Sequence, residues 1–157
     1  MAKSREQDLE SLEDERAIAA KISHQMGIYF LEFDKNETEA AKAFMEAVNR
    51  KMDYGPALMS LAELGARKGD YTMAQNYAQK LLNLEPANQQ ATFLLSNLML
   101  LRSDPVAAVS CLQGLLKEKP DNFEALGELV ILMRRAGLLK EIGPYIDRAK
   151  ESTSHKS

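Results

Sequence analysis

The sequence has few of the residues from which reactive sites are built. Its 157 residues include one cysteine, two histidines and no tryptophan. A single cysteine cannot form a disulfide within the chain, which favours a reducing compartment. A zinc site needs about four closely spaced ligands, but His24 and His155 lie near opposite ends. Glycine-rich phosphate loops and the HExxH and GxSxG motifs are also missing. We therefore predict a protein that is not an enzyme and that uses no cofactor and no metal.

Long apolar runs and an excess of positive charge are missing as well. The longest apolar runs, such as Leu129–Met133, are far shorter than the roughly 20 residues that span a bilayer. The first residues are polar, where a secretory signal would be apolar. The net charge is −3, and the first 20 residues account for all of it. We therefore expect a cytoplasmic protein with no direct membrane insertion and no nucleic-acid partner.

A regular repeat runs through most of the chain. Pro86 and Pro120 close similar patterns and mark the length of one unit. A period of about 34 residues with two helices per unit is typical of tetratricopeptide repeats. Aligned on these prolines, three units share apolar or small residues at five positions, at spacings that place them on one face of each helix. At the seventh position these are Leu61, Leu95 and Leu129, and at the eighth Ala62, Ser96 and Val130.

The predicted fold is all-α, a tetratricopeptide-type α-solenoid. It is expected to form a right-handed superhelix of antiparallel helix pairs with about three and a half to four repeats. The expected organisation is a charged leader (1–20), a degenerate repeat (21–54), two regular repeats (55–88 and 89–122), a repeat with a proline-interrupted second helix (123–151) and a polar tail (152–157). Helices are predicted near 56–68, 71–84, 89–102, 105–118, 122–135 and 139–150. Turn and capping residues support these limits, among them Gly69 with Asp70, Asp104 with Pro105, and a capping box of Asp121 and Glu124.

Both ends of the repeat array are irregular. The degenerate repeat contains Gly27 and Ala40 in the expected order, with one residue inserted near Phe33–Asn36. The leader either adds helical turns around Leu9–Ala20 or is frayed. At the other end, Pro144 requires the last helix to kink or to begin only near Gly143. Only polar residues follow Ile142, Tyr145 and Ile146, so we expect these side chains to need cover from a longer solenoid or from a partner.

The first helices of the repeats predict a protein-binding groove. The concave face of this fold is lined mainly by positions 2, 5, 9, 12 and 13 of each unit. An apolar strip with polar neighbours suggests that a helix or a hydrophobic segment binds there. Glu63, Glu124 and Glu128 occupy positions where a clamp for a terminal carboxylate would need cations, which disfavours a chaperone adaptor. The candidate residues are Met59, Glu63, Phe93, Asn97, Leu100, Ile131, Arg134 and Arg135.

Core packing is the alternative for the apolar members of this set. Leu100 is expected to pack in the core, and Phe93 and Ile131 fit either interpretation. Cys111 is expected to be a small buried hydrophobic residue, not a nucleophile. His24 is expected on the surface of the first degenerate helix, and His155 in a frayed tail.

The C-terminal stretch resembles a known family. The segment KEKPDNFEALGELVILMRRAGLLKEIGPYIDRAKES is similar to the tetratricopeptide repeat protein 21 family in its KPDN turn, its LMRRAG helix end and its LKEIGPYI run. The resemblance covers roughly Ile18 to Ser152 and is most specific over Lys117–Glu151, because a proline inside the second helix is unusual for a generic repeat. Members are several times longer than this chain, so the resemblance implies a fragment or a short form.

The resemblance implies a non-catalytic scaffold. Family members belong to intraflagellar transport complex A, which acts in retrograde ciliary transport and in ciliary cargo entry. The expected partners are therefore other subunits of that complex, and the expected locations are the cytoplasm, the cilium and the basal body. A generic tetratricopeptide adaptor that binds peptides in the apolar groove is the alternative. A regulatory segment of an enzyme is a third possibility, which no residue of the sequence supports.

Overall fold

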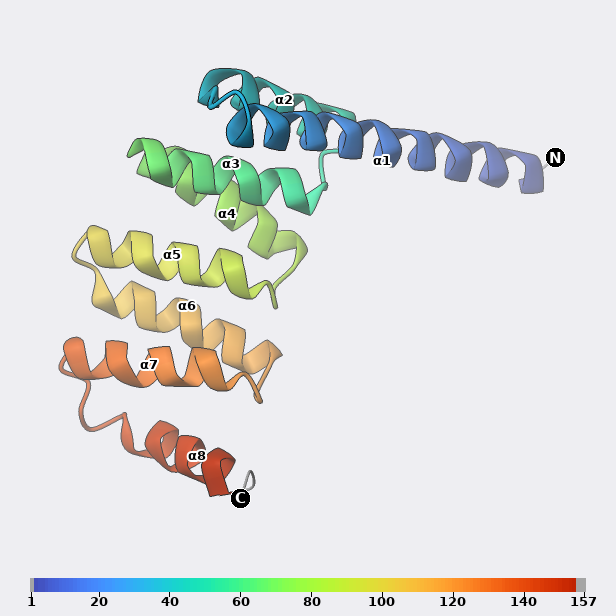
Figure 1. The fold of residues 1–157 in the computed structure, drawn as a ribbon. Coiled ribbons are helices and arrows are strands. Elements are labelled where there is room, and N and C mark those ends of the chain that lie inside the picture. The colour runs from blue at the N-terminus through green and yellow to red at the C-terminus, as the bar shows by residue number, and fades with distance from the viewer. Residues whose placement is uncertain (1, 155–157) are drawn as a thin grey trace. The chain divides into compact units, whose positions relative to one another are not determined.

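The computed structural model describes residues 2–154, and every regular element in that range is a helix. Figure 1 shows the eight helices in chain order. Their bounds are α1 (Ala2–Glu32), α2 (Glu37–Arg50), α3 (Gly55–Lys68), α4 (Tyr71–Leu84), α5 (Gln89–Leu101), α6 (Pro105–Glu118), α7 (Phe123–Arg135) and α8 (Gly143–Ser154).

The helix starts reproduce the predicted period. The first helices α3, α5 and α7 begin at Gly55, Gln89 and Phe123, at equal intervals that match the separation of the two repeat-closing prolines. The second helices α4 and α6 begin at Tyr71 and Pro105, again one period apart. The predicted all-α, tetratricopeptide-type repeat of helix pairs is therefore confirmed.

The chain divides into two compact units within α4, Met1–Tyr77 and Ala78–Ser157. In the first unit, α2 packs against both α1 and α3. The core side chains there are mostly small or aromatic: Ala20, Ala40, Phe44, Ala47, Ala57, Leu61 and Leu64. Gly27 allows α1 to approach α2 closely, because a Cβ at this position would collide with the ring of Phe44.

The second unit has one larger apolar core. Helix α6 packs against α5 and α7, and α7 also packs against α8. Leucines from α6 and α7 dominate this core, and Phe93, Leu100, Tyr145 and Ile146 pack at its edge. The buried members are Ala108, Val109, Leu112, Leu115, Leu116, Ala125, Leu126, Leu129, Leu132, Met133 and Ile142.

Polar caps fix most of the helix starts. Asp70 and Asp104 accept backbone hydrogen bonds from Met73 and Ala107, both at 3.0 Å, as predicted. The C-cap Gly69 of α3 has a φ of 77°, the left-handed conformation that glycine adopts without strain. The predicted capping box of Asp121 and Glu124 is wrong. The cap lies one residue later, where the Asn122 side chain accepts from the Ala125 N–H at 3.0 Å.

The N-terminal leader is part of a continuous helix. Helix α1 runs without a break from Ala2 to Glu32, so the frayed alternative is wrong. The helix does not end at the predicted boundary at residue 20. Burial begins there instead, since Ala20 is the first buried residue of α1.

The C-terminal helix begins at Gly143 and not at residue 139, which confirms the alternative predicted from Pro144. Helix α8 starts at Gly143 with Pro144 in its first turn, where the missing N–H of proline costs no helical hydrogen bond. The helix extends to Ser154, into the predicted polar tail, whereas His155 lies outside the described residues.

The expectation that three apolar residues of this end need external cover is wrong for Ile142, which is buried. Tyr145 and Ile146 are half-buried against the core of the second unit. Two polar contacts also tie α8 down: Gln113 Nε2 donates to the Tyr145 hydroxyl at 3.1 Å, and Arg148 donates to the Pro120 carbonyl. Most of the cover that these side chains need thus comes from α6 and α7.

Candidate protein-binding groove

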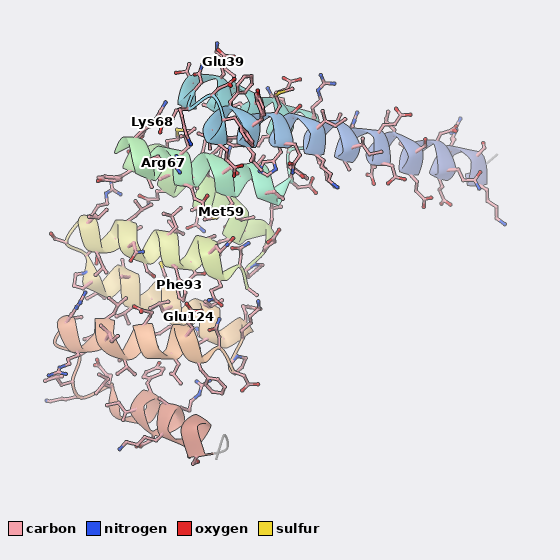
Figure 2. The ribbon with its side chains drawn as sticks, viewed as in Figure 1. Glu39, Met59, Arg67, Lys68, Phe93 and Glu124 are labelled. Carbon is pink, nitrogen blue, oxygen red and sulfur yellow. The ribbon has the colours of Figure 1, made fainter. Side chains whose placement is uncertain are left out.

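The eight predicted groove residues lie on the first helices of the last three repeats, α3, α5 and α7, in both units. Met59 and Glu63 lie on α3 in the first unit; Met59 is half-buried and Glu63 is exposed. The other six lie on α5 and α7 in the second unit. Figure 2 labels Met59 on α3, Phe93 on α5 and Glu124 on α7.

The second unit contains a hollow of about 290 Å³ between α5 and α7, with α6 at its base. It brings together four of the predicted residues, whereas Ile131 and Arg134 do not line it. The lining side chains are Phe93, Ser96, Asn97, Leu100, Leu112, Glu124, Glu128, Leu132 and Arg135.

The apolar lining belongs to the core and to the hollow at once. Phe93 and Leu100 are half-buried and pack against the core of the second unit, while one face of each lines the hollow. Core packing thus applies to both residues without excluding a binding role. Ile131 is 46% exposed, so core packing is wrong for this residue.

Charge is distributed unevenly around the hollow. Glu124 and Glu128 lie one turn apart in the N-terminal half of α7, and Arg135 is its last residue. All three side chains are exposed, so they remain hydrated and available to a ligand. A bound segment would therefore meet carboxylates at one end of the hollow, a cation at the other and apolar side chains between them.

A polar network orients the anionic end. The Asn122 side-chain amide donates to Gln89 Oε1 at 2.7 Å, and the Gln89 amide donates to a Glu124 carboxylate oxygen. These bonds join the start of α5 to the start of α7. They also restrain the Glu124 side chain, which lines the hollow.

Sequence reasoning missed three lining residues, namely Ser96, Leu112 and Leu132. Ser96 occupies the small eighth position of its repeat, and its buried hydroxyl donates to the Ala108 carbonyl at 3.2 Å. The small size of Ser96 predicts a close contact between two helices. Whether Ser96 also lines a hollow depends on how far apart α5 and α7 lie, which no local pattern specifies.

His24 and Cys111 lie in surroundings that differ from those predicted. His24 is only 8% exposed and lies among Phe44, Tyr54 and Ser60, so its predicted surface position is wrong. Burial lowers the pKa of His24, against a smaller opposing effect from the Pro56 backbone. Cys111 is half-buried, not fully buried, and burial raises the pKa of its thiol.

Neither a metal cluster nor a membrane-spanning helix is found in the part of the chain that the structure describes. There, no group of three histidine, cysteine or acidic side chains could hold a metal ion. The helices within residues 2–154 are too short or too polar to cross a bilayer.

Two family models match parts of the sequence. The model described as "TT21 fifth ARM repeats domain" matches residues 89–157. The model described as "Fis1 C-terminal tetratricopeptide repeat" matches residues 60–98.

Solved structures share the fold. A crystal structure of MamA has a TM-score of 0.71 and 16% identity, with 87% of this chain and 80% of that chain covered. The first tetratricopeptide repeat domain of Spaghetti (RPAP3), solved with an HSP90 peptide, has a TM-score of 0.65 and 15% identity, with 77% of this chain and 98% of that chain covered.

Curated relatives cover most of this chain. Tetratricopeptide repeat protein 21A of Mus musculus is 29% identical over 137 residues, which is 87% of this chain and 10% of the relative. The Homo sapiens protein of the same name is 26% identical over 92% of this chain, and tetratricopeptide repeat protein 21B of Xenopus laevis is 24% identical over 89%. The chain spans about a tenth of the length of these relatives. The chain is thus similar to tetratricopeptide repeat proteins 21A and 21B over most of its own length, in agreement with the resemblance of its C-terminal sequence.

Proposed function

We propose that this chain is a non-catalytic scaffold that binds other subunits of intraflagellar transport complex A. In this role it contributes to retrograde ciliary transport and to ciliary cargo entry, in the cytoplasm, the cilium and the basal body. The relatives named tetratricopeptide repeat protein 21 support the choice of complex. The repeat fold supports a role in protein binding, because stacked helix pairs present extended surfaces to partners.

The hollow between α5 and α7 is the observation that carries the binding role. Phe93 and Leu100 offer apolar surface, and Asn97 offers an amide beside them. Glu124 and Glu128 would repel a terminal carboxylate and attract a basic side chain. The segment that fits is a helix or an extended peptide with an apolar anchor followed by lysine or arginine.

Affinity purification of the tagged full chain from ciliated cells tests the proposal. Co-purification of several large complex A subunits is the expected result. Recovery of a single partner with a short motif would instead support the generic adaptor. Recovery of neither would overturn the proposed function.

A charge-reversal pair tests the groove itself. Glu128 lines the hollow and Glu118 of α6 does not, and both side chains are exposed. We expect Glu128→Lys to reduce subunit capture at least about fivefold, the effect of losing roughly 1 kcal/mol of interaction. Glu118→Lys should capture subunits as the unmodified chain does, and circular dichroism should show the same helicity for both variants. If both variants captured subunits equally, the hollow would not be part of the surface that binds them.

A further inference from the structure

Helix α1 has a second apolar face that points away from its core contacts. Ala20, His24 and Gly27 are buried on the side that meets α2 and α3. On the opposite side, apolar residues recur at spacings of four, four, three and four, which places them along one stripe of the helix. This outer stripe consists of Ile18, Ile22, Met26 and Tyr29 of α1 and of Phe33, which directly follows the last residue of that helix. Its members are 48–71% exposed.

The repeat register shows that the equivalent face of a later first helix, α7, is buried. Aligning Gly27 with Val130 at the eighth position matches three stripe residues with three residues of α7. The pairs are Ile22 with Ala125, Met26 with Leu129, and Tyr29 with Leu132. The three α7 residues are buried in the core that α6 and α7 share.

A stripe residue of α1 thus occupies the position at which a first helix meets the second helix of the preceding repeat. Each inner repeat buries this face against its neighbour. Within residues 2–154 no helix takes the place on α1 that α6 takes on α7. Five large apolar side chains in one exposed row exceed the scattered exposure that is normal for a surface.

The acidic residues beyond the stripe indicate the charge of a helix that would bind along α1. Toward the N-terminus the spacing of the stripe continues through Glu15, Ser11 and Asp8. Residues 6–15 contain six acidic residues and no basic one, and all of them are exposed. A helix that follows α1 beyond the stripe therefore meets a strongly anionic surface.

We propose that the outer stripe binds an amphipathic helix of another protein, which runs antiparallel to α1 and carries basic residues after its apolar face. The direction follows from α6, whose C-terminal end leads into the start of α7 (Figure 1). A bound helix of this kind directs its C-terminal end toward the acidic residues 6–15.

A second copy of this chain fits less well. Two α1 helices packed antiparallel through their stripes would bring the acidic segment of one copy near mixed charges of the other, where Glu37 and Glu39 pair with Arg67 and Lys42. A second copy therefore offers no excess of basic residues to that segment. Helix α8 does not supply the complement either, because Asp147, Arg148 and Glu151 keep its outer surface polar and exposed.

Binding of a defined peptide to the full chain tests the proposal. The probe is residues 104–118 of this chain with Cys111→Ser, followed by the extension AKKAKAKA, because α6 covers the equivalent face of α7. The matched peptide has glutamate in place of each lysine of the extension. We expect the lysine peptide to bind with a Kd below about 100 µM and the glutamate peptide to bind at least about tenfold more weakly, by calorimetry at low salt.

A variant of the stripe completes the test. Ile22→Asp combined with Met26→Asp should weaken binding at least about tenfold, while Met52→Asp, at a residue 80% exposed, should leave it unchanged. All three positions are exposed, so thermal unfolding should be the same for both variants. Equal affinity of the stripe variant, equal affinity of the two peptides or no saturable binding would each overturn the proposal. Self-association of the chain that the stripe variant abolishes would identify a second copy as the occupant instead.

Discussion

His24 Nε2 lies 2.9 Å from the Ser60 hydroxyl and thereby joins α1 to α3 in the interior of the first unit. The imidazole also contacts two aromatic rings, with its centroid 5.4 Å from that of Phe44 and 5.8 Å from that of Tyr54. The first helix pair and the start of the next repeat therefore share one polar contact within an apolar setting. The apolar setting favours the neutral imidazole, because burial of a charged ring costs free energy.

Acidification should destabilise the chain through His24. Burial lowers the pKa of His24 below its ordinary value of 6.5, so the unfolded chain binds the proton more readily than the folded chain does. The contribution of this group to stability is complete above pH 6.5 and is lost as the pH falls from 6.5 through the lower folded-state pKa. Urea unfolding at about pH 7.5 and about pH 5.5, above the range in which most carboxylates titrate, measures the difference.

The matched variant is His24→Gln, which keeps a hydrogen-bonding group for Ser60 and has no charge to gain. Its free energy of unfolding should change less between the two pH values than that of the unmodified chain. An equal change in both proteins would assign the pH dependence to other groups.

Alanine at Gly27 should destabilise the first unit. The added methyl group would collide with the buried ring of Phe44, and overpacking of this kind costs about 1–3 kcal/mol. Gly114 of α6 is the control, because a Cβ there meets no atom within 4 Å. Gly114→Ala should stabilise by about 0.5–1 kcal/mol, since alanine loses less backbone entropy in a helix. Chemical denaturation of the two variants should thus give shifts of opposite sign.

Asn122 should contribute to stability through two distinct hydrogen bonds. Its side chain accepts from the Ala125 N–H as the cap of α7 and donates to Gln89. Asn122→Ala removes both bonds and should cost about 1–2 kcal/mol. Asn122→Asp keeps the acceptor for the cap and should cost less than about 1 kcal/mol. If both variants lost the same stability by urea unfolding, the cap would contribute nothing.

The thiol of Cys111 should react slowly in the folded chain. Its half-buried position raises the thiol pKa, which lowers the fraction of thiolate that attacks a disulfide reagent. The rate of reaction with a chromogenic aromatic disulfide near neutral pH should therefore rise when the chain is unfolded in urea. If the folded and the unfolded chain reacted at the same rate, the fold would neither shield the thiol from the reagent nor raise its pKa.

Local sequence patterns predicted the regular helices because their determinants lie within a few residues. Glycine, proline and short polar side chains act on the backbone beside them, so Gly69, Asp70 and Asp104 marked helix ends correctly. The period between Pro86 and Pro120 predicted which helices repeat, because stacked units must bury the same positions. The capping box failed because Asp121 and Asn122 are both good caps. The cap is Asn122, one repeat period after Asn88, which caps α5 in the same way.

The sequence alone thus determined the all-α repeat fold and the helices of the two regular repeats, because helical periodicity fixes the spacing of the residues that they bury. Tertiary structure decided what depends on contacts between helices. Contacts between helices bury His24 and place Phe93 and Leu100 where they pack against the core and also line the hollow. No such contact covers the outer stripe of α1 in the described residues, so the stripe stays exposed. A residue's spacing specifies the face of its helix on which it lies, but only a neighbouring helix decides whether that face is covered.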